Sequence, residues 1–218
     1  MTDFERLRAT MVDNQIRTRG VTNQAVVAQM AKVPRERFVP VERQSIAYID
    51  DLHWFANGAA RRFIMPPATL ARLLQLAEIG PDDAVLDIGA ATGYGTAVMA
   101  GLAASVVGLE ADADLAAQAA DTIRTLGLTN ASIIAGDLAA LRGARFDVIL
   151  VEGAVDSVPA AWLGALNDGG RLIAVIRQRG VCVANVFVKT GSAIAARGEF
   201  DAVLPPLQQA QPEPDFVF

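Results

Sequence analysis

The sequence predicts an α/β fold preceded by an N-terminal helical segment, and three observations support this prediction. Residues 85–100, VLDIGAATGYGTAVMA, run from a buried-strand pattern through a glycine-rich turn directly into a helix pattern. Apolar strand patterns then alternate with helix patterns along the rest of the chain. Before this stretch, residues 4–33 show helical spacing.

The N-terminal segment predicts two short helices, which separate near Gly20 and end before Pro34. Thr22 or Asn23 is expected to cap the second helix. The proline-containing and aromatic-rich residues 33–67 predict an irregular connector, and long connectors inside compact domains are often functional.

The remaining elements follow in order. Residues 68–79, ATLARLLQLAEI, predict an amphipathic helix closed by Gly80 and Pro81. A helix from Thr96 to Leu102 is expected after the glycine turn. Strands are expected near residues 84–88, 105–109, 131–135, 146–151 and 171–176, with further apolar segments near 181–188 and 194–204.

The composition indicates a compact globular chain. Its 218 residues suit a single domain, with residues 1–80 as helices and connector and residues 81–218 as the α/β core with a C-terminal tail. Hydrophobic residues make up 52% of the chain and charged residues 20%, which supplies enough apolar surface for a sizeable core. The tail ends in the apolar trio Phe216 to Phe218, which is expected to dock, a flexible tail being the alternative.

Charge and cysteine content exclude several classes of function. A net charge of -5 without a long basic run argues against a general nucleic-acid binder. No apolar stretch is long enough to span a membrane and the N-terminus resembles no signal peptide, so we expect a cytoplasmic protein. Cys182 and His53 are each the only residue of their kind, which excludes a disulfide within the chain and a two-histidine metal site. Cys182 is expected to be a small core residue, and nothing near His53 supports a Ser-His-Asp triad.

The glycine-rich turn predicts a nucleotide-bearing ligand. Gly89, Gly93 and Gly95 permit a tight turn that presents unpaired helix N-terminal amides. Glu110 follows the next strand, at the spacing of an acid that holds an adenosine ribose. Asp87 precedes the glycines, where its carboxylate either faces a cationic amino group, such as that of S-adenosylmethionine, or caps the turn.

The dinucleotide fingerprint G-x-G-x-x-G does not fit this turn. Ala91 fills the place of the middle glycine, and Val98 would be the third in the later frame. A nicotinamide-dependent oxidoreductase is therefore a weaker alternative.

Several blocks in a fixed order carry a resemblance to a known family. They are VPRERFVP at 33–40, AYIDD at 47–51, VLDIGAATGY at 85–94, Gly136-Asp137, FDVILVEGA at 146–154 and LNDGGRLIAVI at 166–176. With them the chain resembles the protein-L-isoaspartate O-methyltransferase family over nearly its whole length. The VPRE-x-FVP block is the most specific, because generic methyltransferases lack it.

The resemblance implies a Rossmann-like, S-adenosylmethionine-dependent methyltransferase sheet with an N-terminal helical segment. It implies S-adenosyl-L-methionine as the cofactor. The implied reaction is methyl transfer to the free α-carboxylate of isoaspartyl residues in proteins or peptides, which repairs the damaged backbone. We expect neither a nucleic acid nor a membrane as a partner. Asp87 and Gly89 would lie at the methionine end, Glu110 on the ribose and Asp137 near adenine. The remaining cofactor-binding candidates are Ile64, Met65, Gly93 and Leu138.

The chain departs from the family mainly on the substrate side. The family's T-I-S-x-P block corresponds to Phe63 to Pro67, so Met65 stands in the place of the serine that orients the acceptor. A thioether cannot donate a hydrogen bond, which leaves the catalytic residue unknown. HWFANG at 53–58 stands where the family has an LPIG-like segment, and Leu138 replaces the second glycine of its GDG. Arg61 and Arg62 either hold an anion or are ordinary solvated charges.

Three hypotheses therefore stay open beside the oxidoreductase. The first is an isoaspartyl methyltransferase, the second a methyltransferase with a different acceptor, and the third a catalytically inactive, S-adenosylmethionine-binding regulatory or interaction protein. All three predict cofactor binding, and they differ in turnover. The oligomeric state does not follow from the sequence.

Overall fold

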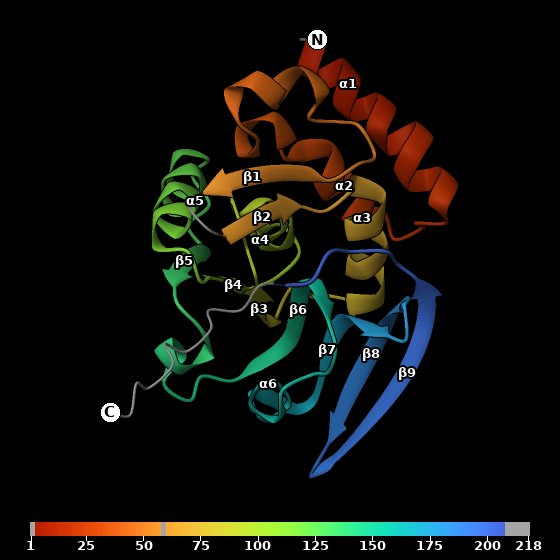
Figure 1. Cartoon of the computed structure of the whole chain (residues 1–218), viewed down its shortest axis with the longest axis vertical. Coiled ribbons are helices and arrows are strands. Elements are labelled where there is room, and N and C mark those ends of the chain that lie inside the picture. The colour runs from red at the N-terminus through yellow and green to blue at the C-terminus, as the bar shows by residue number, and fades with distance from the viewer. Residues whose placement is uncertain (1–2, 58–59, 208–218) are drawn as a thin grey trace.

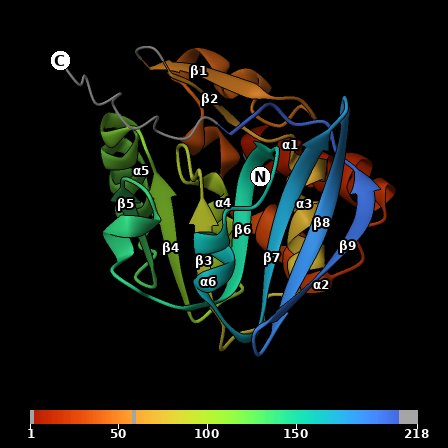
Figure 2. The same cartoon turned by 60° about the horizontal axis from the view of Figure 1, so that its bottom comes forward.

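A computed structural model describes residues 3–57 and 60–207 of the chain. Among these residues a seven-stranded sheet has the order β5-β4-β3-β6-β7-β8-β9, and a separate hairpin lies above one end of it (Figures 1 and 2). The first five strands of that order are parallel, and β8 and β9 join antiparallel. The sheet strands are β3 (Ala84–Ile88), β4 (Ser105–Glu110), β5 (Ala131–Ala135), β6 (Phe146–Val155), β7 (Leu166–Gln178), β8 (Val181–Thr190) and β9 (Ala193–Asp201). The predicted α/β fold is confirmed.

The strand predictions hold with changes at the ends. β3 and β5 have the expected bounds, whereas β6 extends to Val155 and β7 begins at Leu166 rather than at 171. The apolar segments near 181–188 and 194–204 form β8 and β9. Cys182 on β8 is a free, half-buried thiol that packs against the core.

The two faces of the sheet carry separate hydrophobic clusters. Val85, Val148 and Leu150 point to the face that packs against the helices α2 and α3, whereas Leu86 and Ile149 belong to the cluster that holds Trp162 of α6. The helices are α2 (Gln24–Lys32), α3 (Pro67–Ala77), α4 (Tyr94–Ala100), α5 (Ala113–Thr125) and α6 (Ala160–Gly164). Because successive side chains of a strand alternate between faces, the face of each functional side chain follows from its position.

Helix ends shift by a few residues from the predictions. α3 ends at Ala77 instead of 79, because Glu78 adopts a left-handed conformation with φ 47°. α4 spans Tyr94–Ala100 instead of Thr96 to Leu102, since Gly93 with φ 87° already starts the helix as its N-cap.

The N-terminal segment forms α1 (Asp3–Met11) and α2, joined by the π-turn η1 (Val12–Ile16) and the 3₁₀ turn η2 (Arg17–Arg19). Gly20 ends this first part with φ 80°, as expected for a helix end. Asn23, rather than Thr22, caps α2, because its side chain accepts hydrogen bonds from the amides of Ala25 and Val26.

The prediction of an irregular connector is wrong for residues 53–64. Residues 53–57 and 60–64 form the antiparallel strands β1 (His53–Asn57) and β2 (Ala60–Ile64), after the 3₁₀ turns η3 (Arg35–Phe38) and η4 (Val41–Ile46). Consecutive side chains from Arg62 to Ile64 are all buried, which removes the in-out alternation that identifies a strand. Figure 2 shows the hairpin across the ends of β3 and β4.

The apolar tail trio Phe216 to Phe218 lies outside the described residues. Within the described ranges, no helix has the length and apolar character needed to cross a membrane. The same residues hold no group of three or more histidine, cysteine, aspartate or glutamate side chains suited to a metal ion.

Candidate functional site

A pocket of about 290 Å³ opens at the carboxyl ends of the parallel strands β3, β4 and β5. Ligand sites of α/β sheets typically form at this edge, between neighbouring strands whose connections diverge. Apolar side chains and glycine backbone make up most of the wall, and Glu110 and Asp137 provide acidic groups. The lining residues include Arg62, Ile88, Gly89, Leu109, Glu110, Ala111, Asp137, Leu138, Trp162 and Leu207.

Gly89 forms the floor of the pocket together with Leu207. Its φ of 83° favours glycine, and a Cβ at this position would collide with the Leu207 side chain. Leu207 is held in place because its amide donates to the Ala154 carbonyl at 2.8 Å, while the Ala154 amide donates to the Pro205 carbonyl at 2.9 Å. The segment after β9 thus runs beside β6 and completes one wall.

Glu110, the last residue of β4, is completely buried at the pocket. Its carboxylate accepts hydrogen bonds from the amides of Ala91 and Asp112, each at 2.9 Å, and from Arg62 Nε at 2.7 Å. A carboxylate has about four acceptor positions, so about one stays open for a ligand hydroxyl.

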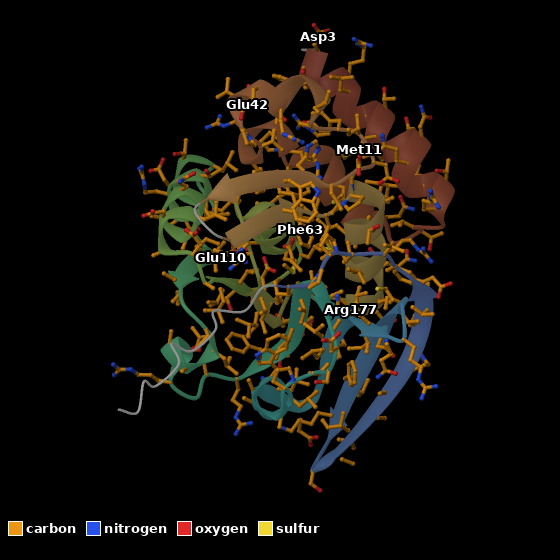
Figure 3. All side chains as sticks on the ribbon, in the orientation of Figure 1. Asp3, Met11, Glu42, Phe63, Glu110 and Arg177 are labelled. Atoms are coloured by element: carbon orange, nitrogen blue, oxygen red, sulfur yellow. The ribbon has the colours of Figure 1, made fainter. Side chains whose placement is uncertain are left out.

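Arg62 on β2 lines the pocket on the side of the hairpin. Figure 3 labels its neighbour in the sequence, Phe63, and its ion-pair partner, Glu110. The Arg62 side chain is only 8% exposed and forms an ion pair with Glu110, which overturns its interpretation as a solvated charge. Nη1 of Arg62 is buried without a hydrogen-bond partner among the described residues. The Arg61 side chain lies outside the described part of the structure.

Asp137 and Leu138 lie at the opposite wall, just after β5. The Asp137 side chain accepts a hydrogen bond from the Ala139 amide at 2.8 Å and so caps the 3₁₀ turn η5 (Leu138–Leu141). The Gly136 amide donates to the Glu110 carbonyl at 2.8 Å, which ties this wall to the end of β4.

A pair of buried carboxyl groups lies on the α4 face of the sheet. Thr96 Oγ1 donates to Asp87 Oδ2 at 2.5 Å, and Asp87 Oδ1 is buried without a partner among the described residues. Burial raises the pKa of Asp87 to about 6, and burial together with Asp87 raises the pKa of Glu152 well above its usual range. Two buried carboxyl groups in contact cannot both ionise easily, which favours the protonated form of Glu152.

A third polar group, Arg35, lies between the hairpin and α4. It is completely buried, and burial lowers its pKa. Its Nε donates to the Ala47 carbonyl at 2.8 Å, its Nη2 donates to the Met65 carbonyl at 2.7 Å, and its guanidinium lies 4.6 Å from the Tyr94 ring centroid. Nη1 of Arg35 has no partner within the described residues.

His53 is buried, and its ring is only a weak base. Burial and the charge of Arg35 lower the pKa of His53 to about 4, so the ring is neutral. Neither ring nitrogen makes a hydrogen bond of normal geometry to the described residues.

The structure brings together half of the predicted cofactor residues. Gly89, Glu110, Asp137 and Leu138 line the pocket. The predicted residues Ile64, Met65, Asp87 and Gly93 are buried but do not line it.

Two of the outlying residues have local explanations. Gly93 has a φ of 87°, and this left-handed conformation at the N-cap of α4 favours glycine. Met65 is completely buried, and its carbonyl is bound by Arg35.

Sequence reasoning missed Arg35, Glu152, Trp162 and Leu207 as residues near the site. Only Glu152 carried a clear signal, since it is a charged residue inside the apolar run of β6. The other three depend on contacts between segments far apart in the chain.

The comparisons with known proteins agree with this geometry. The sequence model of the family "Protein-L-isoaspartate(D-aspartate) O-methyltransferase" matches residues 6–207. A protein-L-isoaspartate O-methyltransferase of Koribacter versatilis is 41% identical over 175 residues, covering 79% of this chain and 78% of the relative. One of Roseiflexus castenholzii is 35% identical over 209 residues, covering 94% of this chain and 93% of the relative.

Solved structures share the fold. A protein-L-isoaspartate O-methyltransferase aligns with a TM-score of 0.81 and 24% identity over 92% of this chain and 66% of its own. A Plasmodium falciparum chain, described as such a methyltransferase and solved with S-adenosyl-L-homocysteine, aligns with a TM-score of 0.79 and 22% identity. That alignment covers 96% of this chain and 100% of the other.

Proposed function

The chain belongs to the protein-L-isoaspartate(D-aspartate) O-methyltransferase family, and on that premise we propose that it transfers a methyl group from S-adenosyl-L-methionine to the α-carboxylate of isoaspartyl residues in proteins or peptides. The observation that carries this proposal is the completely buried Glu110 at the pocket, at the end of the strand after the glycine-rich turn. A carboxylate in this position suits the hydroxyls of an adenosine ribose.

The residues around the pocket fit this cofactor. Glu110 keeps about one acceptor position for a ribose hydroxyl, and Gly89 lines the same pocket. Asp137 and Leu138 would flank the adenine. The unpartnered Oδ1 of Asp87 suits the cationic amino group at the methionine end.

Ile64, Met65 and Gly93 remain assignments by family resemblance. They do not line the pocket, so their contribution to binding would be indirect. Glu110 can accept a hydrogen bond from a second ribose hydroxyl only if the hydrogen bond from Arg62 to Glu110 breaks.

The chemistry asks for orientation more than for proton transfer. S-adenosyl-L-methionine supplies a methyl group on a sulfonium, which is a good leaving group. A carboxylate oxygen of the acceptor forms the new C–O bond as the methyl–sulfur bond breaks, and the electron pair of that bond stays on sulfur. The acceptor is already deprotonated, so the protein needs to bind, align and exclude water.

A second candidate is a cofactor-binding protein without turnover. The observation that favours it is Met65, which is buried at the place of the family's acceptor-orienting serine and cannot donate a hydrogen bond. Both candidates require the same pocket, and only methyl transfer separates them.

Calorimetric binding of S-adenosyl-L-homocysteine to the wild type and to Glu110→Gln tests the cofactor assignment. We expect the wild type to bind and Glu110→Gln to bind about 10-fold to 100-fold more weakly, because the ribose loses a charged hydrogen-bond acceptor. Exposed Glu42→Gln is the matched control and should bind like the wild type. Equal affinity of all three proteins would contradict the role of Glu110.

A further inference from the structure

Glu152 occupies a position that the cofactor pocket does not explain. The register pairs Ile88 of β3 with Val151 of β6, so Glu152 lies one residue beyond, beside Gly89 at the carboxyl edge. Val148 and Leu150 point to the α4 face, and Glu152 follows on that face by alternation. Glu152 does not line the pocket around Glu110.

The carboxyl group of Glu152 is tightly enclosed. The side chain is only 3% exposed, and a Cβ at Gly95 would collide with its Oε1. Oε1 makes no hydrogen bond to the described residues. Buried polar atoms without partners are rare in native proteins, so each one calls for a specific explanation.

The charged groups around Glu152 come from three other elements. Asp87 of β3 contacts it, and Arg35 of η3 and Glu110 of β4 act on it through their charges. Burial and Asp87 raise the pKa of Glu152 well above the usual range, whereas Arg35 lowers it. Burial beside Asp87 therefore favours the neutral carboxylic acid form of Glu152, which is a hydrogen-bond donor.

Arg35 connects Glu152 with Met65. The guanidinium binds the Met65 carbonyl through Nη2, its Nη1 has no partner among the described residues, and its charge acts on Glu152. Arg35 thus bridges the end of the hairpin and the carboxyl edge of the sheet. Asp87 contacts the Glu152 carboxyl group, and the charge of Arg35 acts on it. Met65, whose carbonyl Arg35 binds, offers no side-chain hydrogen-bond donor.

We propose that Glu152 orients the methyl acceptor by donating a hydrogen bond from its carboxylic acid to the acceptor carboxylate, the task that Met65 cannot perform. This inference rests on the proposed function and names the residue that replaces the family serine. The proton stays on Glu152 throughout. One acceptor oxygen accepts this hydrogen bond and the other forms the bond to the methyl carbon.

Two substitutions of similar volume distinguish hydrogen-bond donation by the residue 152 side chain from its contribution to packing. Glu152→Gln keeps an N–H donor, and Glu152→Met fills the space without one. We expect Glu152→Gln to stay within about tenfold of the wild-type kcat on an isoaspartyl peptide, and Glu152→Met to lose about a further 10²-fold, as removal of one oriented donor does. Exposed Glu42→Gln controls for loss of a negative charge.

Two readouts are independent of turnover. All variants should bind S-adenosyl-L-homocysteine within about threefold of the wild type, because Glu152 acts on the acceptor. Infrared spectra of the wild type at neutral pH should show a protonated-carboxyl C=O band that disappears in Glu152→Gln.

The pH dependence gives a further check. Wild-type kcat should fall at alkaline pH as Glu152 loses its proton, and Glu152→Gln should lack this fall.

Two results would overturn the inference alone: Glu152→Gln as inactive as Glu152→Met with intact cofactor binding, or no protonated-carboxyl band from Glu152. The first result would mean that Glu152 acts as a carboxylate, which accepts a hydrogen bond from an N–H group or pairs with a cation on the methylated substrate. A wild type that binds S-adenosyl-L-homocysteine but methylates no isoaspartyl peptide would overturn the proposed function, and this inference with it.

Discussion

At the scale of single residues, the Arg62–Glu110 ion pair lines the pocket. The Arg62 side chain is 8% exposed, and the Glu110 side chain is fully buried. Breaking a buried pair by removing one partner is costly, because the other charge stays in a low-dielectric environment. The arginine therefore both stabilises the hairpin and competes with a ligand for Glu110.

Arg62→Met should lower the free energy of unfolding by about 3–5 kcal/mol, because it leaves Glu110 buried without its ion-pair partner. Arg6→Met is the control, since Arg6 pairs with Asp3 on the surface and should cost at most about 1 kcal/mol. Urea denaturation followed by circular dichroism measures both. Similar small losses for the two variants would show that the buried pair contributes little.

His53 gives the protein a specific loss of stability in acid. Its pKa in the folded protein is about 4, below the 6.5 of an unperturbed histidine. Between these values the unfolded chain binds a proton that the folded protein does not, so stability falls as the pH falls through this window.

His53→Gln isolates this effect, because His53 is the only histidine in the chain. The difference in free energy of unfolding between wild type and variant should be constant above about pH 7. As the pH falls from 6.5 to 4, the wild type should lose stability relative to the variant, and below pH 4 the difference should level off. Denaturant titrations along the pH series measure it, and a difference that does not change with pH would contradict the burial of an uncharged ring.

At the scale of elements, local patterns predicted the parallel strands well, and contacts between distant segments decided the rest. β3 and β5 have the predicted bounds because short apolar runs between turn residues identify them. The hairpin escaped prediction because Arg62 is buried by pairing with Glu110, which lies 48 residues away.

The sequence predicted either Thr22 or Asn23 as the N-cap of α2. Asn23→Ala should cost about 1 kcal/mol of stability, because the amides of Ala25 and Val26 lose their acceptor. Thr22→Ala should cost much less, since its hydroxyl makes only a 3.5 Å contact with Gln75. Thermal denaturation of the two variants compares them directly, and a larger loss for Thr22→Ala would refute the assignment.

The candidate site was predictable from the sequence where local motifs carry it. The glycine turn and Glu110 follow from strand–turn–helix spacing, which predicted Gly89 and Glu110, and both residues line the pocket. Arg35 and Leu207 were missed, because only the folded chain brings them to the carboxyl edge. Met65 was identified through family resemblance, yet its burial and its contact with Arg35 required the structure.

At the scale of the whole molecule, the N-terminal segment and the sheet share one hydrophobic cluster. That cluster runs from Met11 through the α3 residues to Leu204, which supports the proposal of a single domain. The hairpin is therefore held by the N-terminal segment on one side and by Glu110 on the other. Arg35 binds the carbonyl of Met65 at the end of the hairpin, and its charge acts on Glu152 at the carboxyl edge of the sheet.

The chemical nature of the methylated product tests the central claim most directly. The wild type is incubated with labelled S-adenosyl-L-methionine and with two peptides that differ only in aspartyl or isoaspartyl linkage, and the products are then treated with mild base. The account predicts label on the isoaspartyl peptide alone, released as methanol because the product is a carboxyl methyl ester. Label that survives base, or equal labelling of both peptides, would contradict it.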